Sequence, residues 1–213
     1  MDIKLEQLIP LPLTEFEIPD SEIWEADSFI FEGGKSYLIE APSGKGKTSL
    51  LSILYGIRKD YKGKFFLNDA EGATLSAGDW SVYRKEKLSY VFQGLELFED
   101  LSALDNILLK NKMTDYYSEQ EIRGMAERLS VESFLHKKAG ILSFGQRQRM
   151  AIIRALCMPF EFLFADECFS HIDRSNSKIA FELISEECKK RNAGVLLSSL
   201  GKTEGSFDET VKL

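Results

Sequence analysis

The chain of 213 residues has no long hydrophobic run, few histidines and few cysteines, and no excess of basic side chains. No apolar stretch approaches the roughly 20 residues that a membrane-spanning helix needs, and the charged N-terminus does not resemble a signal peptide. The sequence therefore predicts a soluble, cytoplasmic protein. Hydrophobic residues make up 44% of the chain, which is enough to bury the core of one α/β domain.

The small number of cysteines and the excess of acidic side chains argue against a disulfide-rich protein and against a nucleic-acid-binding protein. Cys157, Cys168 and Cys188 form no CxxC pair and are odd in number, which favours reduced thiols over a disulfide framework. Acidic side chains outnumber basic ones by 34 to 27, which gives a net charge of -7. Because a broad basic surface is missing, we expect no nucleic-acid partner.

The segment YLIEAPSGKGKTSLL, from Tyr37 to Leu51, is an apolar strand that runs through a glycine-rich turn into an amphipathic helix. Gly44 and Gly46 allow the backbone N–H groups and the helix N-terminus to surround a polyphosphate. Lys47 can reach the β- and γ-phosphates, and the Thr48 hydroxyl can ligate Mg²⁺. The turn therefore predicts a nucleotide-binding phosphate loop made of Ala41, Pro42, Ser43, Gly44, Lys45, Gly46, Lys47, Thr48 and Ser49. A kinase, a GTPase or an ATPase can contain such a loop.

Two acidic residues, Asp166 and Glu167, end the apolar strand that begins near Glu161. A buried strand that carries two carboxylates to its end is costly unless they face a cation or a water molecule that needs activation. We therefore expect Asp166 to hold Mg²⁺ through its water shell and Glu167 to polarise the attacking water.

Strands and helices alternate along most of the chain, which predicts a mostly parallel sheet with helices on both sides. Short apolar runs separated by proline and glycine predict strands and turns before residue 40, including runs around Leu11 and Phe16. Between residues 94 and 142 the periodicity is helical, with a capping box at Ser118 and Glu121.

The segment Leu142-Ser143-Phe144-Gly145-Gln146, with the helix that follows it, resembles the signature segment of ATP-binding cassette (ABC) ATPases. Ser143 is placed as an N-cap, and the helix N-terminus offers unpaired N–H groups to an anion. The resemblance continues at Val91-Phe92-Gln93, which matches the Q-loop, and at residues 169–173, which match the D-loop. It implies that Gln93 contacts Mg²⁺ or the attacking water. It also implies that Ser143, Phe144, Gly145 and Gln146 face the γ-phosphate of ATP held by another subunit.

This resemblance implies a single ABC ATPase domain over residues 1–213. Its fold would be an α/β P-loop NTPase core with a mostly parallel sheet, an N-terminal antiparallel β subdomain and an inserted α-helical subdomain at about residues 94–142. The implied function is ATP hydrolysis by a head-to-tail homodimer or heterodimer, with ATP and Mg²⁺ as cofactors. The implied partners are separate integral membrane permease subunits, contacted through residues 93–142 from the cytoplasmic face of the membrane.

The resemblance is strongest to small exporter or lipoprotein-release cassettes, because of the compact length and the segment VFQGLELFEDLSALDN. One alternative is an ATP-gated regulatory protein that closes on ATP but hydrolyses little of it. A second alternative, a soluble ABC ATPase acting on nucleic acid or ribosomes, is disfavoured by the acidic balance.

The sequence departs from the family pattern at several positions. Ala41 replaces the first glycine of the phosphate loop, Phe144 replaces the second glycine of the signature, and Cys168 follows the acidic pair in place of proline. Phe16 and Trp24 are both candidates for the aromatic residue that stacks on adenine.

The position of the family's switch histidine holds Ser199, a candidate catalytic residue. Serine can donate a hydrogen bond to a γ-phosphate but cannot carry a proton near neutral pH, so we expect slow hydrolysis. Ser199→His should therefore raise the turnover number for ATP, measured by phosphate release at saturating MgATP. An unchanged or lower rate would contradict this interpretation.

Overall fold

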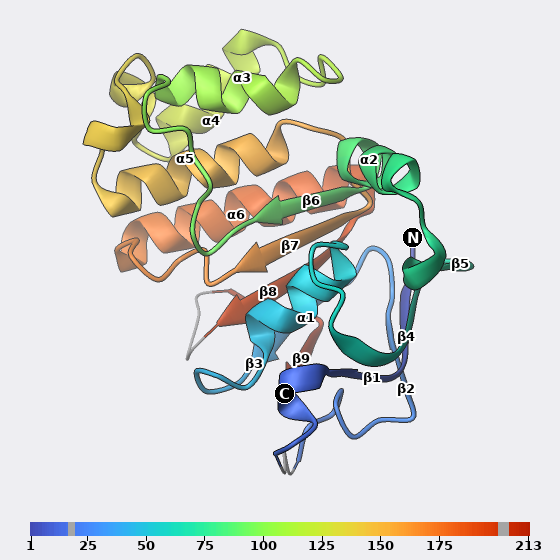
Figure 1. Ribbon diagram of the computed structural model, residues 1–213. Helices are drawn as coiled ribbons and strands as arrows, with labels where there is room; N and C mark the ends of the chain where they lie inside the picture. The colour runs from blue at the N-terminus through green and yellow to red at the C-terminus, as the bar shows by residue number, and fades with distance from the viewer. Residues whose placement is uncertain (17–19, 200–204) are drawn as a thin grey trace.

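The computed structural model describes residues 1–16, 20–199 and 205–213 (Figure 1). The principal helices are α1 (Lys47–Leu54), α2 (Ala77–Glu86), α3 (Ala103–Asn111), α4 (Glu119–Arg128), α5 (Phe144–Leu156) and α6 (Arg174–Arg191). The strands are β1 (Ile3–Pro10), β2 (Ser28–Phe31), β3 (Ser36–Glu40), β4 (Tyr61–Leu67), β5 (Ala70–Glu71), β6 (Leu88–Val91), β7 (Phe162–Asp166), β8 (Gly194–Ser199) and β9 (Glu209–Lys212). None of the helices in these residues is long and apolar enough to cross a membrane.

A parallel sheet of five strands, in the order β6-β7-β8-β3-β9, forms the centre of the molecule. Its inner strands are continuous apolar runs, as expected for parallel strands that are covered on both faces. In β7, Leu163 and Ala165 face the core shared with α5 and α6, whereas Phe162 and Phe164 face the core shared with α1. Figure 1 shows α1 on one side of the sheet and α5 and α6 on the other. The predicted α/β class is confirmed.

A second sheet is antiparallel, in the order β2-β1-β4-β5, and it packs on the α1 side of the parallel sheet. Its strands alternate between buried and exposed residues: in β1, Ile3 and Leu5 are buried while Lys4 and Glu6 form a surface ion pair. This alternation is typical of a sheet with one face in water. The sheet takes strands from both sides of α1, so it is built from more than the N-terminal segment.

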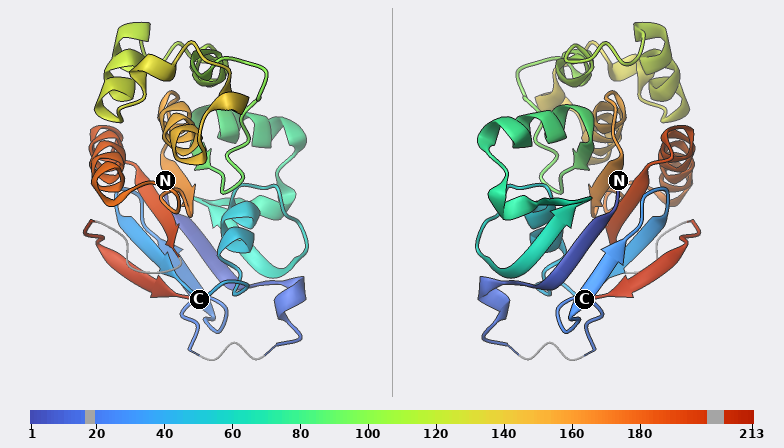
Figure 2. Two further views of the ribbon diagram at one scale, coloured as in Figure 1. Left: turned by 90° about the vertical axis from the view of Figure 1, so that its left-hand side faces the viewer. Right: turned by 90° about the vertical axis from the view of Figure 1, so that its right-hand side faces the viewer.

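Helices α3 and α4 lie at the end of the molecule farthest from the N-terminal 3₁₀ helix at Leu11–Leu13 (Figure 2). Each is started by a serine whose side chain accepts a hydrogen bond from a backbone N–H, Ser102 for α3 and Ser118 for α4. The capping box predicted at Ser118 and Glu121 is present. Residues 94–142 thus form a helical layer over α5. All of these residues are described by the structure, and none of them belongs to a β-strand.

Some local predictions are wrong. Leu11 begins a 3₁₀ helix, because Pro12 fixes the backbone there, and Phe16 lies in a turn that follows it. Helix α2 was not predicted, and it is anchored mainly by the buried ring of Trp80. The three cysteines are free and buried, which confirms that they are unpaired thiols. Burial raises the pKa of the Cys188 thiol to about 12, so it is unreactive near neutral pH.

Candidate nucleotide-binding site

The glycine-rich turn follows β3 and leads directly into α1. Gly46 is the N-cap of α1 with φ = 97°, a left-handed conformation that favours glycine. A Cβ atom at Gly46 would lie 2.8 Å from Cδ1 of Leu13 and 3.1 Å from the Trp24 ring. The turn is therefore packed tightly against these two side chains, and it lies at the N-terminus of the helix, where the dipole is positive.

Lys47, the first residue of α1, folds its side chain back over the loop. Its Nζ donates hydrogen bonds to the carbonyl oxygens of Ala41 (2.7 Å) and Pro42 (3.2 Å). It also lies 3.5 Å from Oε1 of Glu167, and the two side chains are only 4% and 11% exposed. A buried ammonium group is thus held beside the loop with a carboxylate as its anionic partner.

A cavity of about 330 Å³ opens in front of this loop. It is lined by loop and α1 residues, by Gln93 and Glu167, and by the end of β1 and the 3₁₀ helix. Its lining residues are Pro10, Pro12, Leu13, Ser43, Gly44, Gly46, Lys47, Thr48, Ser49, Arg58, Gln93 and Glu167. Segments that are far apart in the sequence therefore meet at the predicted phosphate loop.

Asp166 ends β7 and is 1% exposed. The Ser198 hydroxyl, on the neighbouring strand β8, donates to Oδ1 of Asp166 at 2.6 Å, and the Tyr90 hydroxyl on β6 donates to Oδ2 at 3.4 Å. Burial and the charge of Asp166 raise the pKa of Tyr90, so its hydroxyl remains a donor. The carboxylate is therefore fixed in orientation by the two strands beside its own.

Glu167 follows with φ = 46°, an uncommon conformation for a residue with a side chain. Hydrogen bonds fix its backbone on both sides: its N–H donates to the Ser198 hydroxyl at 3.1 Å, and its carbonyl accepts from Nε2 of Gln148 at 3.2 Å. Nε2 of Gln93 donates to Oε2 of the Glu167 side chain at 3.0 Å. The strained backbone turns this carboxylate out of the strand and toward Lys47.

The signature residues lie at the start of α5. Ser143 is the N-cap, and it forms a capping box with Gln146. A Cβ atom at Gly145 would lie 2.6 Å from the carbonyl oxygen of His171, so the D-loop backbone needs a glycine here. None of the four signature residues, Ser143, Phe144, Gly145 and Gln146, lines the phosphate cavity of its own chain.

Phe144 packs on the D-loop. Its ring centroid is 4.3 Å from that of His171. The Arg147 guanidinium lies over the Phe144 ring, 5.5 Å from the ring centroid. The bulky side chain that replaces glycine is thus supported by residues of its own chain. His171 also contacts the Ser170 hydroxyl through Nδ1 at 2.9 Å.

The two aromatic candidates for adenine stacking are in different environments. Trp24 is buried, packs behind Gly46, and donates from its indole N–H to the Lys45 carbonyl at 3.1 Å. It therefore supports the loop, and its candidacy for stacking is wrong. Phe16 is 66% exposed and close in sequence to the cavity-lining Leu13, so it stays a prediction.

Sequence reasoning missed the roles of Ser198, Tyr90 and Gln148. Ser198 is buried at 1% and contacts both acidic residues, whereas the singled-out Ser199 is the partly exposed end of β8. The available signal was a hydroxyl residue inside an otherwise apolar strand. Such a group needs a buried hydrogen-bond partner, and the neighbouring strand supplies it.

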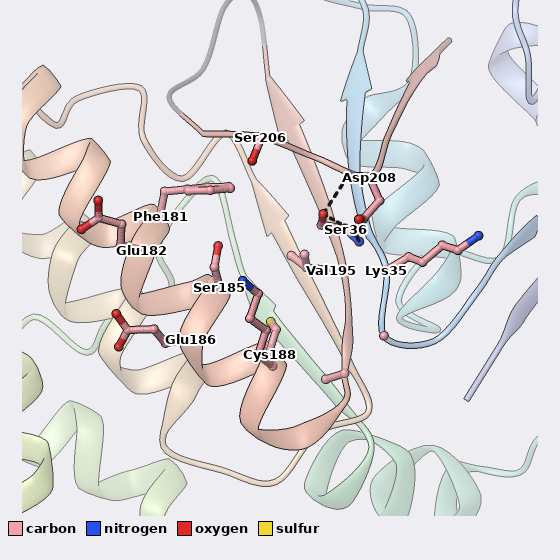
Figure 3. Close-up of a pocket in the computed structure, with 13 residues that line it drawn as sticks. Lys35, Ser36, Phe181, Glu182, Ser185, Glu186, Cys188, Val195, Ser206 and Asp208 are labelled. Atoms are coloured by element: carbon pink, nitrogen blue, oxygen red, sulfur yellow. Dashed lines mark hydrogen bonds between the residues drawn. The ribbon is translucent and has the colours of Figure 1, made fainter.

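A second cavity, of about 390 Å³, lies between α6 and the starts of β3 and β9 (Figure 3). Asp208 lies at its edge and accepts hydrogen bonds from the backbone N–H and the hydroxyl of Ser36, both at 2.7 Å. The Ser36 hydroxyl bond and the backbone bond lower the pKa of Asp208. These polar groups serve to join β9 to β3, and the cavity contains none of the predicted site residues.

The protein-family comparison decides the relationship. The family model described as ABC transporter matches residues 25–170, from the segment before the phosphate loop to the start of the D-loop. The chain belongs to the ABC transporter family. The resemblance inferred from its motifs is thereby confirmed.

Curated ABC proteins are similar over most of this chain. One is the lipoprotein-releasing system ATP-binding protein LolD of Buchnera aphidicola, 32% identical over 78% of this chain and 74% of LolD. Another is the ABC transporter ATP-binding protein YxdL of Bacillus subtilis, 32% identical over 74% of this chain but only 62% of YxdL. A solved ABC structure is also similar: the ATP-binding cassette MJ0796, in a dimeric post-hydrolysis state with ADP and Pi. It has a TM-score of 0.74 and 25% identity, covering 92% of this chain and 87% of MJ0796.

The contacts of Ser198 generate a prediction about catalysis. Ser198→Ala removes one donor to the Asp166 carboxylate, so that carboxylate loses orientation. It also removes one of two acceptors of the Glu167 N–H, which keeps its bond to the Ser198 carbonyl at 3.2 Å. We expect kcat for ATP hydrolysis to fall about tenfold with little change in KM.

The matched control is Ser89→Ala. Ser89 is equally buried, and its hydroxyl donates to the Ala155 carbonyl at 2.6 Å, away from the two carboxylates. A steady-state ATPase assay should show a near-normal kcat for this variant. Equal kcat values for the two variants would contradict the role given to Ser198.

Proposed function

We propose that this protein is the ATP-hydrolysing subunit of an ABC transporter, working as a head-to-tail dimer on separate membrane subunits. One observation carries the proposal. Each chain brings the phosphate loop, Gln93 and Glu167 to one cavity, but it leaves Ser143 and the start of α5 outside that cavity. A second copy, or a related cassette, would supply the missing helix N-terminus. The dimeric state of the similar cassette MJ0796 supports this arrangement.

ATP would bind with its phosphates over the loop and the N-terminus of α1. The terminal phosphate would replace Glu167 as the anionic partner of Lys47, because both anions need the same buried ammonium group. The Glu167 carboxylate would then be free to accept a proton from the attacking water. Glu167 and Gln93, which are hydrogen-bonded to each other, would orient that water together. Ser199, at the end of β8, is proposed to donate a hydrogen bond near the same phosphate.

Mg²⁺ would be held by Thr48, Gln93 and, through water, Asp166. The described residues contain no group of three or more acidic, histidine or cysteine side chains that could hold a metal by themselves. This fits Mg²⁺, which uses one or two protein ligands together with substrate phosphates and water. When bound, the ion would neutralise charge on the β- and γ-phosphates.

Removing the charge of Glu167 without changing its size tests hydrolysis and dimer formation together. Glu167→Gln keeps the size of the side chain but removes the proton acceptor, so we expect the turnover number to fall at least about a hundredfold. ATP should then persist in the site and hold two subunits together. Phosphate release and sedimentation velocity with MgATP measure the two effects.

The matched control is Glu161→Gln. Glu161 lies just before β7, and its carboxylate is 41% exposed, in contact with Lys87 and the N-terminus. This variant should hydrolyse ATP normally and remain mainly monomeric after turnover. A Glu167→Gln protein that keeps normal turnover, or that stays monomeric with bound ATP, would contradict the proposal.

The helical layer offers an apolar surface for the membrane subunits. Phe98 is 60% exposed, and Ile141 is 72% exposed. Backbone hydrogen bonds join their segments, from the Gly140 N–H to the Glu99 carbonyl and from the Ala139 N–H to the Leu101 carbonyl. Exposed apolar residues on adjacent segments are typical of an interaction site. This surface lies in the region 93–142, so we propose that permease subunits bind there and hold the protein at the cytoplasmic face of the membrane.

A charge placed on this surface should weaken that association. Phe98→Asp introduces an acidic group where an apolar contact is proposed, and we expect the amount of protein recovered with native membranes to fall several-fold. Val82→Asp is the control, since Val82 is 50% exposed on α2 outside this surface. Equal recovery of both variants with membranes would contradict the proposed binding surface.

A further inference from the structure

Arg58 lines the phosphate cavity although it belongs to none of the motifs found in the sequence. It follows α1, and the chain turns back there, with the Arg58 N–H donating to the Ser52 carbonyl at 3.1 Å. This turn sends the side chain toward the first turn of the helix. NH1 of Arg58 donates to the hydroxyl of Ser49 at 2.7 Å. A guanidinium group is thus placed beside Ser49, which lies two residues after Lys47, and all three residues line the same cavity.

Asp60 fixes this guanidinium group in place. Its two carboxylate oxygens accept from Nε and NH2 of Arg58, both at 2.7 Å, in a bidentate pair. The contact with Arg58 lowers the pKa of Asp60, so the carboxylate is charged at neutral pH. A planar fork held in this way is pre-organised, because little side-chain freedom remains to be lost when it binds a ligand.

The pair does not exhaust the hydrogen-bonding capacity of Arg58. A guanidinium group has five N–H donors, and the bonds to Asp60 and Ser49 within the described chain use three of them. The Arg58 side chain is 28% exposed, on the cavity side of the molecule. A salt bridge this exposed contributes little to stability, so stability alone does not account for its placement.

The order of residues around the cavity indicates which part of a nucleotide meets Arg58. Lys47, Gln93 and Glu167 gather at the end proposed for the terminal phosphate. Ser49 lies further along α1, beyond Thr48, and Arg58 is bonded to it. Pro10, Pro12 and Leu13 give the cavity an apolar part of its lining, which suits a base. The phosphate nearest the nucleoside would therefore pass beside Ser49 and Arg58.

We infer that Arg58 is a nucleotide-binding residue whose guanidinium group, positioned by Asp60 and Ser49, contacts the α-phosphate of a bound nucleoside diphosphate or triphosphate. The inference rests on the proposed nucleotide-binding function. Since the α-phosphate is common to ADP and ATP, Arg58 strengthens the binding of both equally. It sets the overall affinity of the site, while Lys47 and Glu167 respond to the terminal phosphate.

The test measures dissociation constants of MgADP and of a non-hydrolysable MgATP analogue by isothermal titration calorimetry. Arg58→Ala should weaken both nucleotides about tenfold, with their ratio unchanged, because a charge-assisted hydrogen bond is lost in each case. Arg58→Gln, which keeps most of the stem for packing, should show the same loss. Lys59→Ala is the control: it removes the same charge from the next, exposed residue and should leave both constants unchanged.

The outcomes separate this inference from the proposed function. Normal affinity in Arg58→Gln, or a loss confined to the triphosphate, would overturn the role of Arg58 while leaving nucleotide binding intact. A wild-type protein that binds neither nucleotide, or a Lys47→Ala variant that binds as well as wild type, would instead contradict the proposed function. A lower melting temperature without a change in affinity would mark Arg58 as structural and would also overturn the inference.

Discussion

The placement of one buried ammonium group, that of Lys47, constrains much of this structure. Burying a positive charge is costly unless it is hydrogen-bonded and paired. The loop carbonyls of Ala41 and Pro42 and the carboxylate of Glu167 meet that need. This requires a loop that turns sharply at Gly46, and a strand that delivers Glu167 to the same edge of the sheet. The parallel order of β3, β8 and β7 satisfies both requirements.

The same arrangement explains why the acidic groups are so firmly held. If the Glu167 carboxylate must leave Lys47 when a phosphate binds, the side chain has to move while the backbone of Glu167 stays in place. The bonds from its N–H to Ser198 and from Gln148 to its carbonyl keep that backbone fixed. Asp166 is fixed in the same way by Ser198 and Tyr90. Ser198 therefore bonds both the carboxylate of Asp166 and the backbone of Glu167, and its position on β8 links the two strands that end at the site.

Much of the fold could be predicted from the sequence, because apolar runs and glycine-rich turns have local causes. The buried runs at β3, β7 and β8 and the capping box at Ser118 are examples. Helix α2 was missed because its apolar contacts are distant in sequence: its one buried residue, Trp80, packs against Gly56 and Phe65. The motif residues that gather at the phosphate cavity were also predicted from local patterns, whereas the contacts of Ser198 and Arg58 depend on tertiary neighbours.

The central claim is that the site is incomplete in one chain and is completed by the Ser143 end of α5 from another. A crystal structure of the Glu167→Gln protein with MgATP tests it most directly. The account predicts two chains head to tail, with each γ-phosphate in contact with Lys47 of one chain and Ser143 of the other. A structure with ATP bound over Lys47 and Ser143 of every chain facing solvent would contradict it.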